Sequence, residues 1–460
     1  MRRIRVWILS LVALTGLFSA TGVDVTNTPA SGNARPFVLD LPTTLQLAGA
    51  RNLEIQIARE KLTEARADHE SAVWQFFPSI IPGLGYRRHD DLIQDVAGNV
   101  TEVHKDSYTV GPTLSGQLDL GDAIYRKLAA HQRVKAAGFA AESQRQESLL
   151  AAAECYFDLT RSHAAGRVAE DSIRIAEEFA AQLKQAVGAG IAFRGDALRA
   201  EVQVDRNRLA LRQAREQSIL AAARLVRILH LDFSPETAMA VSDDGLVPLV
   251  LIATNRTLEA MVVRAKTLRP EIQQSRTQIR AAEDLRDGAR YGPLVPSLGA
   301  QVFAGGLGGG VNNGPGRFGA SEDYQFTLGW RLGPGGLFDR GRIRANESRL
   351  QVARLNDQKL ADDITREVVE GLTRVQSLGD QLQTARHAVE TASEVLRLAA
   401  DRKEFAVGAV LERIQSEQDL THARLDFLTL VAEFNKAQFA LQKAAGEPMP
   451  SGEPTISHPR

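Results

Sequence analysis

Apolar residues recur every seven positions in the second half of the chain, between residues 361 and 399, with charged residues between them. One row is Ala361, Val368, Val375, Leu382, Val389 and Leu396, and the other is Ile364, Gly371, Leu378, Ala385, Ala392 and Ala399. A pattern kept over about five heptads predicts a long helix with a coiled-coil seam.

A matching pattern follows a break near Gly408. One row is Leu420, Phe427, Phe434 and Leu441, and the other is Ala423, Leu430, Ala437 and Ala444. Because the break is short, the two helices must fold back on each other as an antiparallel hairpin. The first half of the chain has the same plan with a less regular seam.

Alternation of apolar and polar residues interrupts the helical stretches twice. Tyr324, Phe326 and Leu328 alternate with polar or small residues, and residues 108–118 alternate in the same way. We therefore predict two strands within 78–120 and two within 296–338. Segments of about ten alternating residues fit a transmembrane β-strand, and they also fit a half-buried strand of a soluble sheet.

The same order of segments occurs in both halves, which predicts two tandem repeats of one structural unit. Glu54-Ile55-Gln56 returns as Glu271-Ile272-Gln273, and Pro78-Ser79 returns as Pro296-Ser297. The predicted organisation is a signal peptide at 1–22, an extended segment at 23–40, repeat 1 at 41–235, a linker at 236–256, repeat 2 at 257–445 and a disordered tail at 446–460. Helices are predicted at 43–75, 122–186 and 196–229, and at 258–291, 340–406 and 410–444.

The helices at 122–186 and 340–406 would each be roughly 100 Å long at 1.5 Å per residue. No globular core is that deep, so we expect an elongated body. The formal net charge of -1 provides no basic field for nucleic acid. The single cysteine, Cys155, allows no intrachain disulfide.

The first residues have the layout of a secretory signal peptide. Arg2, Arg3 and Arg5 precede an apolar stretch from Val6 to Phe18, and small residues follow it. No later apolar stretch is long enough for a spanning helix. We therefore expect a mature chain outside the cytoplasm, without a transmembrane helix.

Four strands per chain cannot close a barrel, and open sheet edges are not tolerated in lipid. Two chains would supply eight strands, whose interior side chains would fill, whereas three would supply twelve and leave a lumen. If the strands cross a membrane, several copies must share one barrel.

The whole mature chain resembles the outer-membrane efflux protein family, the TolC-like trimeric exit ducts. The resemblance rests on Arg269-Pro270-Glu271 and its weaker mate Arg51-Asn52-Leu53-Glu54. It also rests on the Pro-Ser pairs at the start of the strand segments, on Phe338-Asp339-x-Gly341 at the end of the second one, and on the Val-Gly pairs at both hairpin turns.

This resemblance implies a homotrimer in the outer membrane, with a twelve-stranded transmembrane β-barrel and a long periplasmic α-helical coiled-coil tunnel. The tunnel tip would dock on a periplasmic adaptor protein, which links it to an inner-membrane pump. The corresponding adaptor-docking tips are Val187, Gly188, Gly190, Val407 and Gly408. Glycine permits a sharp reversal and a close partner backbone, although these glycines could equally be helix caps.

The family often has acidic residues after each turn that narrow the periplasmic end. Asp196 matches that position in the first half. In the second half Ile414 takes the nearest place and Glu417 lies one turn further, which argues against a constriction by acidic residues there. An ordinary role as partners of the helix N-terminal dipoles is the alternative for both. The predicted strand-helix junctions are Pro78, Gly121, Pro296 and Gly341.

No motif assigns a reaction. The glycines at 305–310 lack the Gly-Lys-Ser/Thr of a phosphate loop, and the histidines show no metal-ligand spacing. We therefore expect neither an enzyme, nor a cofactor, nor a metal site. The hypothesis is a passive exit duct of a tripartite efflux or type I secretion system, in contact with outer-membrane lipid. The alternative is a soluble periplasmic coiled-coil scaffold, and the cargo and the pump class stay open.

Overall fold

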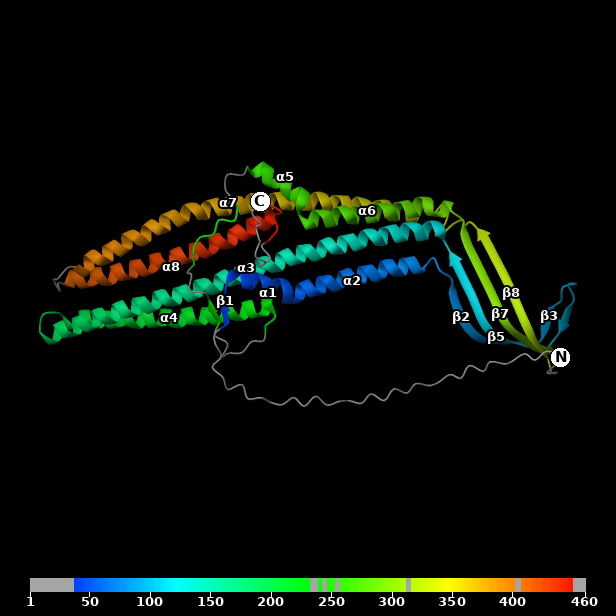
Figure 1. The fold of residues 1–460 in the computed structure, drawn as a ribbon, viewed down its shortest axis with the longest axis horizontal. Coiled ribbons are helices and arrows are strands. Elements are labelled where there is room, and N and C mark those ends of the chain that lie inside the picture. The colour runs from blue at the N-terminus through cyan, green and yellow to red at the C-terminus, as the bar shows by residue number, and fades with distance from the viewer. Residues whose placement is uncertain are drawn as a thin grey trace, which may run out of the picture.

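The computed structural model describes residues 37–231, 239–241, 246–252, 257–311, 316–401 and 407–449. The described part is elongated, with long helices side by side and a β-sheet at one end (Figure 1). The predicted signal peptide at 1–22 and residues 450–460 of the predicted tail lie outside the described residues.

Two long helices, α3 and α7, carry the body. The first half contains α1 (Leu41–Arg51), α2 (Leu53–Trp74), α3 (Leu120–Gly188) and α4 (Arg194–Leu229). The second half contains α5 (Leu258–Leu268), α6 (Pro270–Tyr291), the 3-10 helix η1 (Gly292–Leu294), α7 (Arg340–Asp401) and α8 (Val407–Ala444). With 69 residues, α3 is roughly 100 Å long. It packs against α4, α6, α2 and α8, while α7 packs against α8 and α6. Within the described part of the chain, no helix is long and apolar enough to span a membrane.

The single helices predicted at 43–75 and 258–291 are wrong, because each is broken in two. Asn52, with φ -59° and ψ 128°, separates α1 from α2. Arg269, with φ -60° and ψ 134°, separates α5 from α6, which begins at Pro270. Proline pushes the preceding residue out of the helical region, and asparagine is a good helix cap. Apolar residues occur on both sides of each break, so hydrophobicity alone does not mark the breaks.

The main sheet has the strand order β2-β5-β7-β8, and all its pairs are antiparallel. Its strands are β2 (Ser79–His89), β5 (Lys105–Leu118), β7 (Ser297–Val311) and β8 (Arg317–Gly329). The outer edges of β2 and β8 have no strand partner within the described chain. Two smaller pairs were not predicted: β3 (Leu92–Gln94) with β4 (Val100–Glu102), and β1 (Phe37–Leu39) with β6 (Met239–Val241).

The core follows the helix seams rather than a central globule. The heptad rows predicted for α7 pack against α8. Val368 (0% exposed) and Val375 (1% exposed) of α7 lie in one cluster with Phe434 and Leu441 of α8. A second cluster joins α1, α3 and α4 near the middle of the body, and a third lies near the far end of α3 and α4.

The described residues of the predicted linker contact α8, and the start of the predicted tail packs against the helices. In the linker, the backbone N–H groups of Leu249, Leu251 and Ile252 donate hydrogen bonds to the side chains of Asn435 and Gln438 on α8. The prediction of a disordered tail from residue 446 is wrong for its first residues. Gly446, with φ 71°, turns the chain after α8, and Met449 is buried in the cluster of α1, α3 and α4.

Candidate functional site

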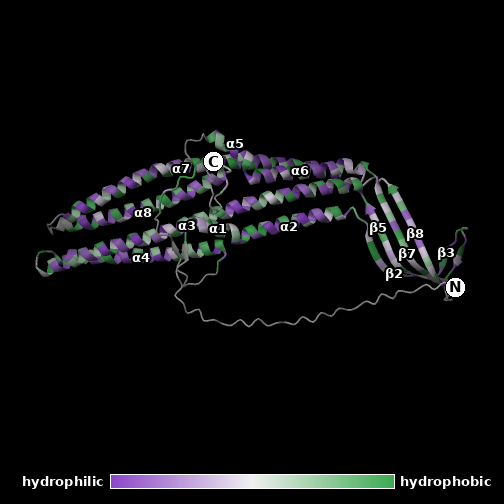
Figure 2. Cartoon of the chain, viewed as in Figure 1, coloured by the Kyte–Doolittle hydropathy of each residue, from purple (hydrophilic) through white to green (hydrophobic). Residues whose placement is uncertain are grey.

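The main sheet has one apolar and one polar face. The strand pairing places the odd-numbered residues of β2, β5, β7 and β8 on one side and the even-numbered residues on the other. The even-numbered side, here called the apolar face, is exposed in the protomer at Ile80, Leu84, Tyr86, Phe318, Tyr324, Phe326 and Leu328. The alternation is visible along the strands in Figure 2. A face of this kind is stable only if lipid or another apolar surface covers it.

The odd-numbered side, here called the polar face, is hollowed near the helices. The hollow has a volume of about 830 Å³. Its polar lining includes Ser79, Ser115, Gln117, Gln301, Gln325, Thr327 and Arg331. The hydroxyl and amide groups offer hydrogen bonds to water or to a polar solute, and Arg331 is the one charged group in this lining. The sheet therefore separates an apolar exterior from a wettable surface.

The junctions between the sheet and the helices differ in the two halves. Pro78 and Pro296 directly precede β2 and β7. Gly121, in the first turn of α3, is required by close packing: a Cβ there would lie 2.1 Å from the carbonyl oxygen of Gly292. Gly341, in the first turn of α7, has only Asp339 Oδ1 nearby, at 3.5 Å. The close approach thus joins Gly121 in the first half to Gly292 in the second, and Gly341 has no equivalent contact.

Charged residues bridge the two halves at this level. Arg342 donates to Asp122 Oδ1 at 2.6 Å and to the carbonyl oxygen of Gly335 at 3.0 Å. Asp339 accepts the backbone N–H groups of Arg342 and Gly335, and these bonds hold the pKa of its carboxyl below the ordinary value. The start of α7 is therefore tied to the start of α3.

The first hairpin tip connects α3 to α4 at the end of the body far from the sheet (Figure 1). Among the predicted tip residues, Val187 and Gly188 are the last residues of α3, and Gly190 makes the turn with φ 72°. Glycine adopts this left-handed conformation without strain. Ile191 and Phe193 project from the tip and are 67% and 69% exposed.

The second tip connects α7 to α8. Residues 402–406 lie outside the described residues, and Val407 and Gly408 form the first turn of α8. The helix predicted at 410–444 therefore begins at Val407 in the structure, before the predicted start.

The two predicted constriction residues lie inside the protomer. Asp196 is 1% exposed in the first turn of α4 and accepts a hydrogen bond from Arg199 at 3.0 Å. Glu417 is 3% exposed and accepts a hydrogen bond from Asn207 of α4 at 3.0 Å. Burial raises the pKa of Glu417 above the ordinary value, although the bond from Asn207 opposes the shift. A role of Glu417 as an N-terminal dipole partner is wrong, because α8 begins at Val407, almost three turns earlier.

Sequence reasoning missed the polar residues around Glu417. Asn207 also donates to the carbonyl oxygen of Ser172, and Gln203 accepts from Gln418 at 2.6 Å. Ser172 and Thr421 share a hydrogen bond at 2.9 Å. These contacts join α3, α4 and α8. The available signal was a set of amides and hydroxyls on helices whose buried positions are otherwise mostly apolar.

The chain matches the family described as outer membrane efflux protein over residues 44–229 and 261–447. It belongs to this family. Protein CyaE of Bordetella pertussis (strain Tohama I) is 26% identical over 401 residues, which cover 81% of this chain and 76% of that protein.

Solved structures of similar fold include a membrane protein from Pseudomonas aeruginosa, with a TM-score of 0.75, 20% identity, and coverage of 93% of this chain and 95% of that one. The CmeC outer membrane channel of Campylobacter jejuni has a TM-score of 0.72, 17% identity, and coverage of 88% and 85%. The open state of the MtrE outer membrane channel of Neisseria gonorrhoeae has a TM-score of 0.69, 18% identity, and coverage of 88% and 89%. The fold is thus that of outer-membrane channels rather than of enzymes. Among the described residues, no group of three or more His, Cys, Asp or Glu side chains is placed to hold a metal ion.

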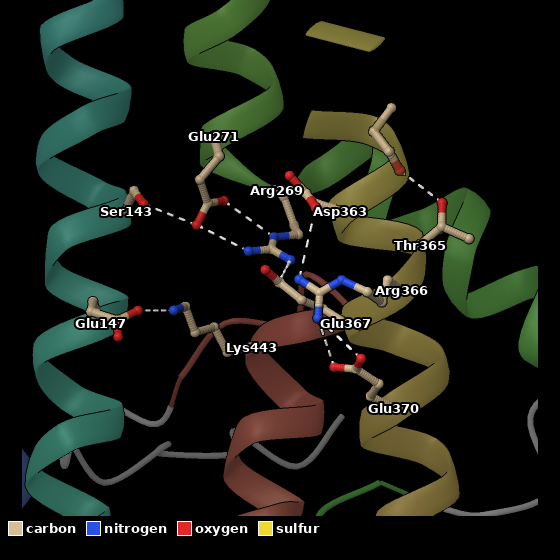
Figure 3. A network of polar contacts seen from close by, with 11 residues as sticks. Ser143, Glu147, Arg269, Glu271, Asp363, Thr365, Arg366, Glu367, Glu370 and Lys443 are labelled. Atoms are coloured by element: carbon tan, nitrogen blue, oxygen red, sulfur yellow. Dashed lines mark hydrogen bonds and ion pairs between the residues drawn. The ribbon is translucent and has the colours of Figure 1, made fainter. Parts of the chain in front are cut away.

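In this efflux family member, the motif Arg269-Pro270-Glu271 forms a buried ionic junction (Figure 3). Arg269 is 4% exposed and donates to both carboxylate oxygens of Glu271 at 3.2 Å and to Glu367 on α7. Ser143 of α3 donates to Glu271 at 2.9 Å. Burial opposes the charges of both residues, but their mutual bonds outweigh it, so the pKa of Arg269 is raised and that of Glu271 is lowered. The break between α5 and α6 is thereby fastened to α7 and α3.

The corresponding break in the first half is held by a neutral side chain. Asn52 Oδ1 accepts the backbone N–H groups of Glu54 and Ile55 at 2.9 and 3.3 Å, and the hydroxyl of Ser148 on α3 at 3.3 Å. Its amide donates to the carbonyl oxygen of Ile228 on α4 at 2.9 Å. This amide caps α2 and joins the break to α3 and α4.

Proposed function

We propose that the chain is one subunit of a homotrimeric exit duct that serves a tripartite efflux or type I secretion system. Three copies would join their sheets into a twelve-stranded barrel in the outer membrane, above a periplasmic tunnel of helices. The duct would conduct cargo passively, because an inner-membrane pump supplies the energy. The observation that carries this proposal is the four-stranded sheet with an apolar face, a hollowed polar face and two unpaired edges.

The physical argument is one of closure. Lipid would cover the apolar face, but lipid offers no hydrogen bonds to the open edges of β2 and β8. Pairing β8 of one copy with β2 of the next satisfies both edges, and three copies leave a lumen. A soluble scaffold would instead expose Leu84, Tyr86 and Phe326 to water, at 81%, 67% and 72%.

Fractionation of cells that express the chain tests this assembly. The duct predicts recovery from outer-membrane detergent extracts as an oligomer whose electrophoretic migration changes on heating. Release by osmotic shock as a detergent-free monomer would overturn the proposal and favour the soluble scaffold.

The exposed first tip is the proposed adaptor-docking surface, together with Val407 and Gly408 of the second tip. Ile191 and Phe193 offer apolar side chains beside a glycine turn, where a partner backbone can approach closely. We expect the double substitution of Ile191 and Phe193 by aspartate to weaken crosslinking to the periplasmic adaptor and to reduce export. Ile219→Asp, at a 63% exposed position of α4 away from the tip, is the control and should leave docking unchanged. Normal adaptor crosslinking by the tip variant would remove this role.

The proposed closable end lies between the hairpins α3–α4 and α7–α8, near Asp196 and Glu417. A sliding of one hairpin against the other would have to break the bond from Asn207 to Glu417. Cysteines at the exposed Leu198 that crosslink neighbouring subunits should block export without disturbing assembly, and reduction should restore it. Export that continues at the normal rate through crosslinked trimers would exclude a gate at this position.

A further inference from the structure

Basic residues gather on the polar face at the end of the sheet farthest from the helices. Arg87 of β2 pairs with Ser107, Ser107 with Gly309, and Gly309 with Arg317 of β8, so both arginines lie in one cross-strand row. Lys105 of β5, two residues from Ser107, lies in the next row on the same face. Arg87, Lys105 and Arg317, here called the basic rim, are all exposed.

The polar face offers little negative charge to balance this rim. Among the odd-numbered residues of the four strands, Asp323 is the one acidic residue. It lies six residues from Arg317 along β8, about 20 Å away at the rise of an extended strand. The ion pairs found among the described residues do not include Arg87, Lys105 or Arg317. The rim is therefore a region of uncompensated positive charge on its face.

The nearest acidic residues belong to other surfaces. Asp106 and Glu322 have even numbers and lie on the apolar face. Asp90, beyond the last paired residues of β2 and β5, is engaged by Arg88 at 2.9 Å and by His104 at 3.0 Å. Glu102 lies on β4, in the loop beyond the rim. These groups do not interrupt the rim.

Small residues around the rim leave its long side chains unobstructed. Gly309 separates Ser107 from Arg317, and a Cβ there would lie 2.5 Å from the carbonyl oxygen of Asp106. Gly319 follows Arg317 on the same face and has open space around it. The charged groups of the basic rim are therefore accessible to solutes at the polar face.

Arg87 and Arg317 lie on the two edge strands of the sheet. In the proposed assembly, β8 of one copy pairs with β2 of the next. Arg317 on β8 then lies on the strand next to β2 of the neighbouring copy, which carries Arg87. The three rims then join into a closed ring at the outer mouth. Rings of arginine and lysine select anions in pores, because they raise the local concentration of negative solutes.

We propose that this basic ring makes the exit of the duct favour anionic cargo, whose carboxylate or phosphate groups it attracts as the cargo leaves. The inference rests on the proposed function and deepens it by naming the charge class of the cargo. It concerns the exit alone and does not depend on how the periplasmic end opens.

The test is the reversal potential of purified channels in planar lipid bilayers under a potassium chloride gradient. The variant Arg87→Glu/Lys105→Glu/Arg317→Glu should shift the reversal potential toward the equilibrium potential of potassium. The chloride-to-potassium permeability ratio should fall by a factor on the order of ten. The shift should shrink at high salt because mobile ions screen the ring. Arg87→Lys/Arg317→Lys, which keeps the charge, and Glu102→Gln, which changes a loop charge beyond the rim, should keep the wild-type potential within a small margin.

If the triple variant fails to assemble, Lys105→Gln and Arg87→Gln, measured singly, should each shift the potential in the same direction by less. Channels of normal conductance with an unchanged reversal potential in all these variants would overturn the basic ring and leave the duct standing. Wild-type protein that forms no channels would instead overturn the proposed function.

Discussion

The two helix breaks in the middle of the body are both joined to neighbouring helices, but by different side chains. The first-half break uses the neutral amide of Asn52, and the second-half break uses the ion pairs of Arg269 with Glu271 and Glu367. Both reach α3, through Ser148 and Ser143 respectively. The difference shows that the geometry of a junction can be kept while its charge changes.

The consequence is an unequal sensitivity to substitution. An amide that loses its bonds leaves uncharged groups unpaired, whereas an ion pair that loses one member leaves a buried charge. The second-half junction should therefore be the more fragile to substitution and the only one of the two that responds to acid.

The largest expected effect is at Arg269. Arg269→Met removes the charge but keeps much of the side-chain volume, and leaves Glu271 buried beside an apolar chain. We expect the free energy of unfolding in detergent to fall by about 3–5 kcal/mol. Chemical denaturation measures the change. Arg366→Met, at an exposed ion pair with Glu370 in the same region of α7, is the control and should change little.

A loss below about 1 kcal/mol for Arg269→Met, the range of exposed ion pairs, would mean that the junction is hydrated and that the contrast with Asn52 is not one of buried charge.

The next effect separates the two sheet junctions. In Gly121→Ala, the added methyl group would meet the backbone of Gly292, so we expect a loss of about 1–3 kcal/mol from overpacking. Gly341→Ala is the matched variant in the second half, where space is available, and should gain about 0.5–1 kcal/mol because alanine is the better helix former. Thermal unfolding of both variants measures the difference. Equal effects at the two positions would contradict the one-sided close approach.

Asn52→Ala should have a smaller effect than Arg269→Met. It removes the cap of α2 and leaves the carbonyl oxygen of Ile228 without its donor, for an expected loss of about 1–2 kcal/mol. The measurement is the same denaturation series as for Arg269→Met. A loss as large as that of Arg269→Met would show that the two junctions are equally sensitive and would contradict the predicted contrast.

The smallest expected effect is the pH dependence of the stability that Glu271 contributes. The pKa of Glu271 is lowered in the folded protein, so its contribution is fully present above the ordinary value of 4.5 and is lost as the pH falls through the lower folded pKa. The stability difference between wild type and Glu271→Gln should therefore shrink in acid. The difference for Asn52→Ala should stay constant over the same range, because that amide does not titrate. Parallel pH profiles for the two variants would contradict the assignment.

The seams and the strands could be predicted because periodicity reports which face is buried. Val368 and Val375 lie in the core as the heptad rows predict, and the alternating segments form the main sheet. The breaks at Asn52 and Arg269 could not be found in this way, because the apolar pattern continues on both sides of them. Local cap and proline chemistry carried that signal instead.

The candidate site was less accessible from sequence. The contacts of Glu417 depend on Asn207, 210 residues away in the chain, and no local pattern indicates that pairing. The tail from residue 446 is predicted to be disordered, whereas Met449 packs into an apolar cluster built from distant helices. The basic rim also escaped notice, because Arg87 and Arg317 become neighbours in one row only after the strand register is known.

The open edges of β2 and β8 have a genetic consequence. In the proposed assembly, each subunit needs two further copies to close the barrel, so one defective copy inactivates the trimer that it joins. An allele that folds and pairs but cannot conduct should therefore be dominant over the wild-type allele when both are expressed. An allele that cannot pair its edges should be recessive.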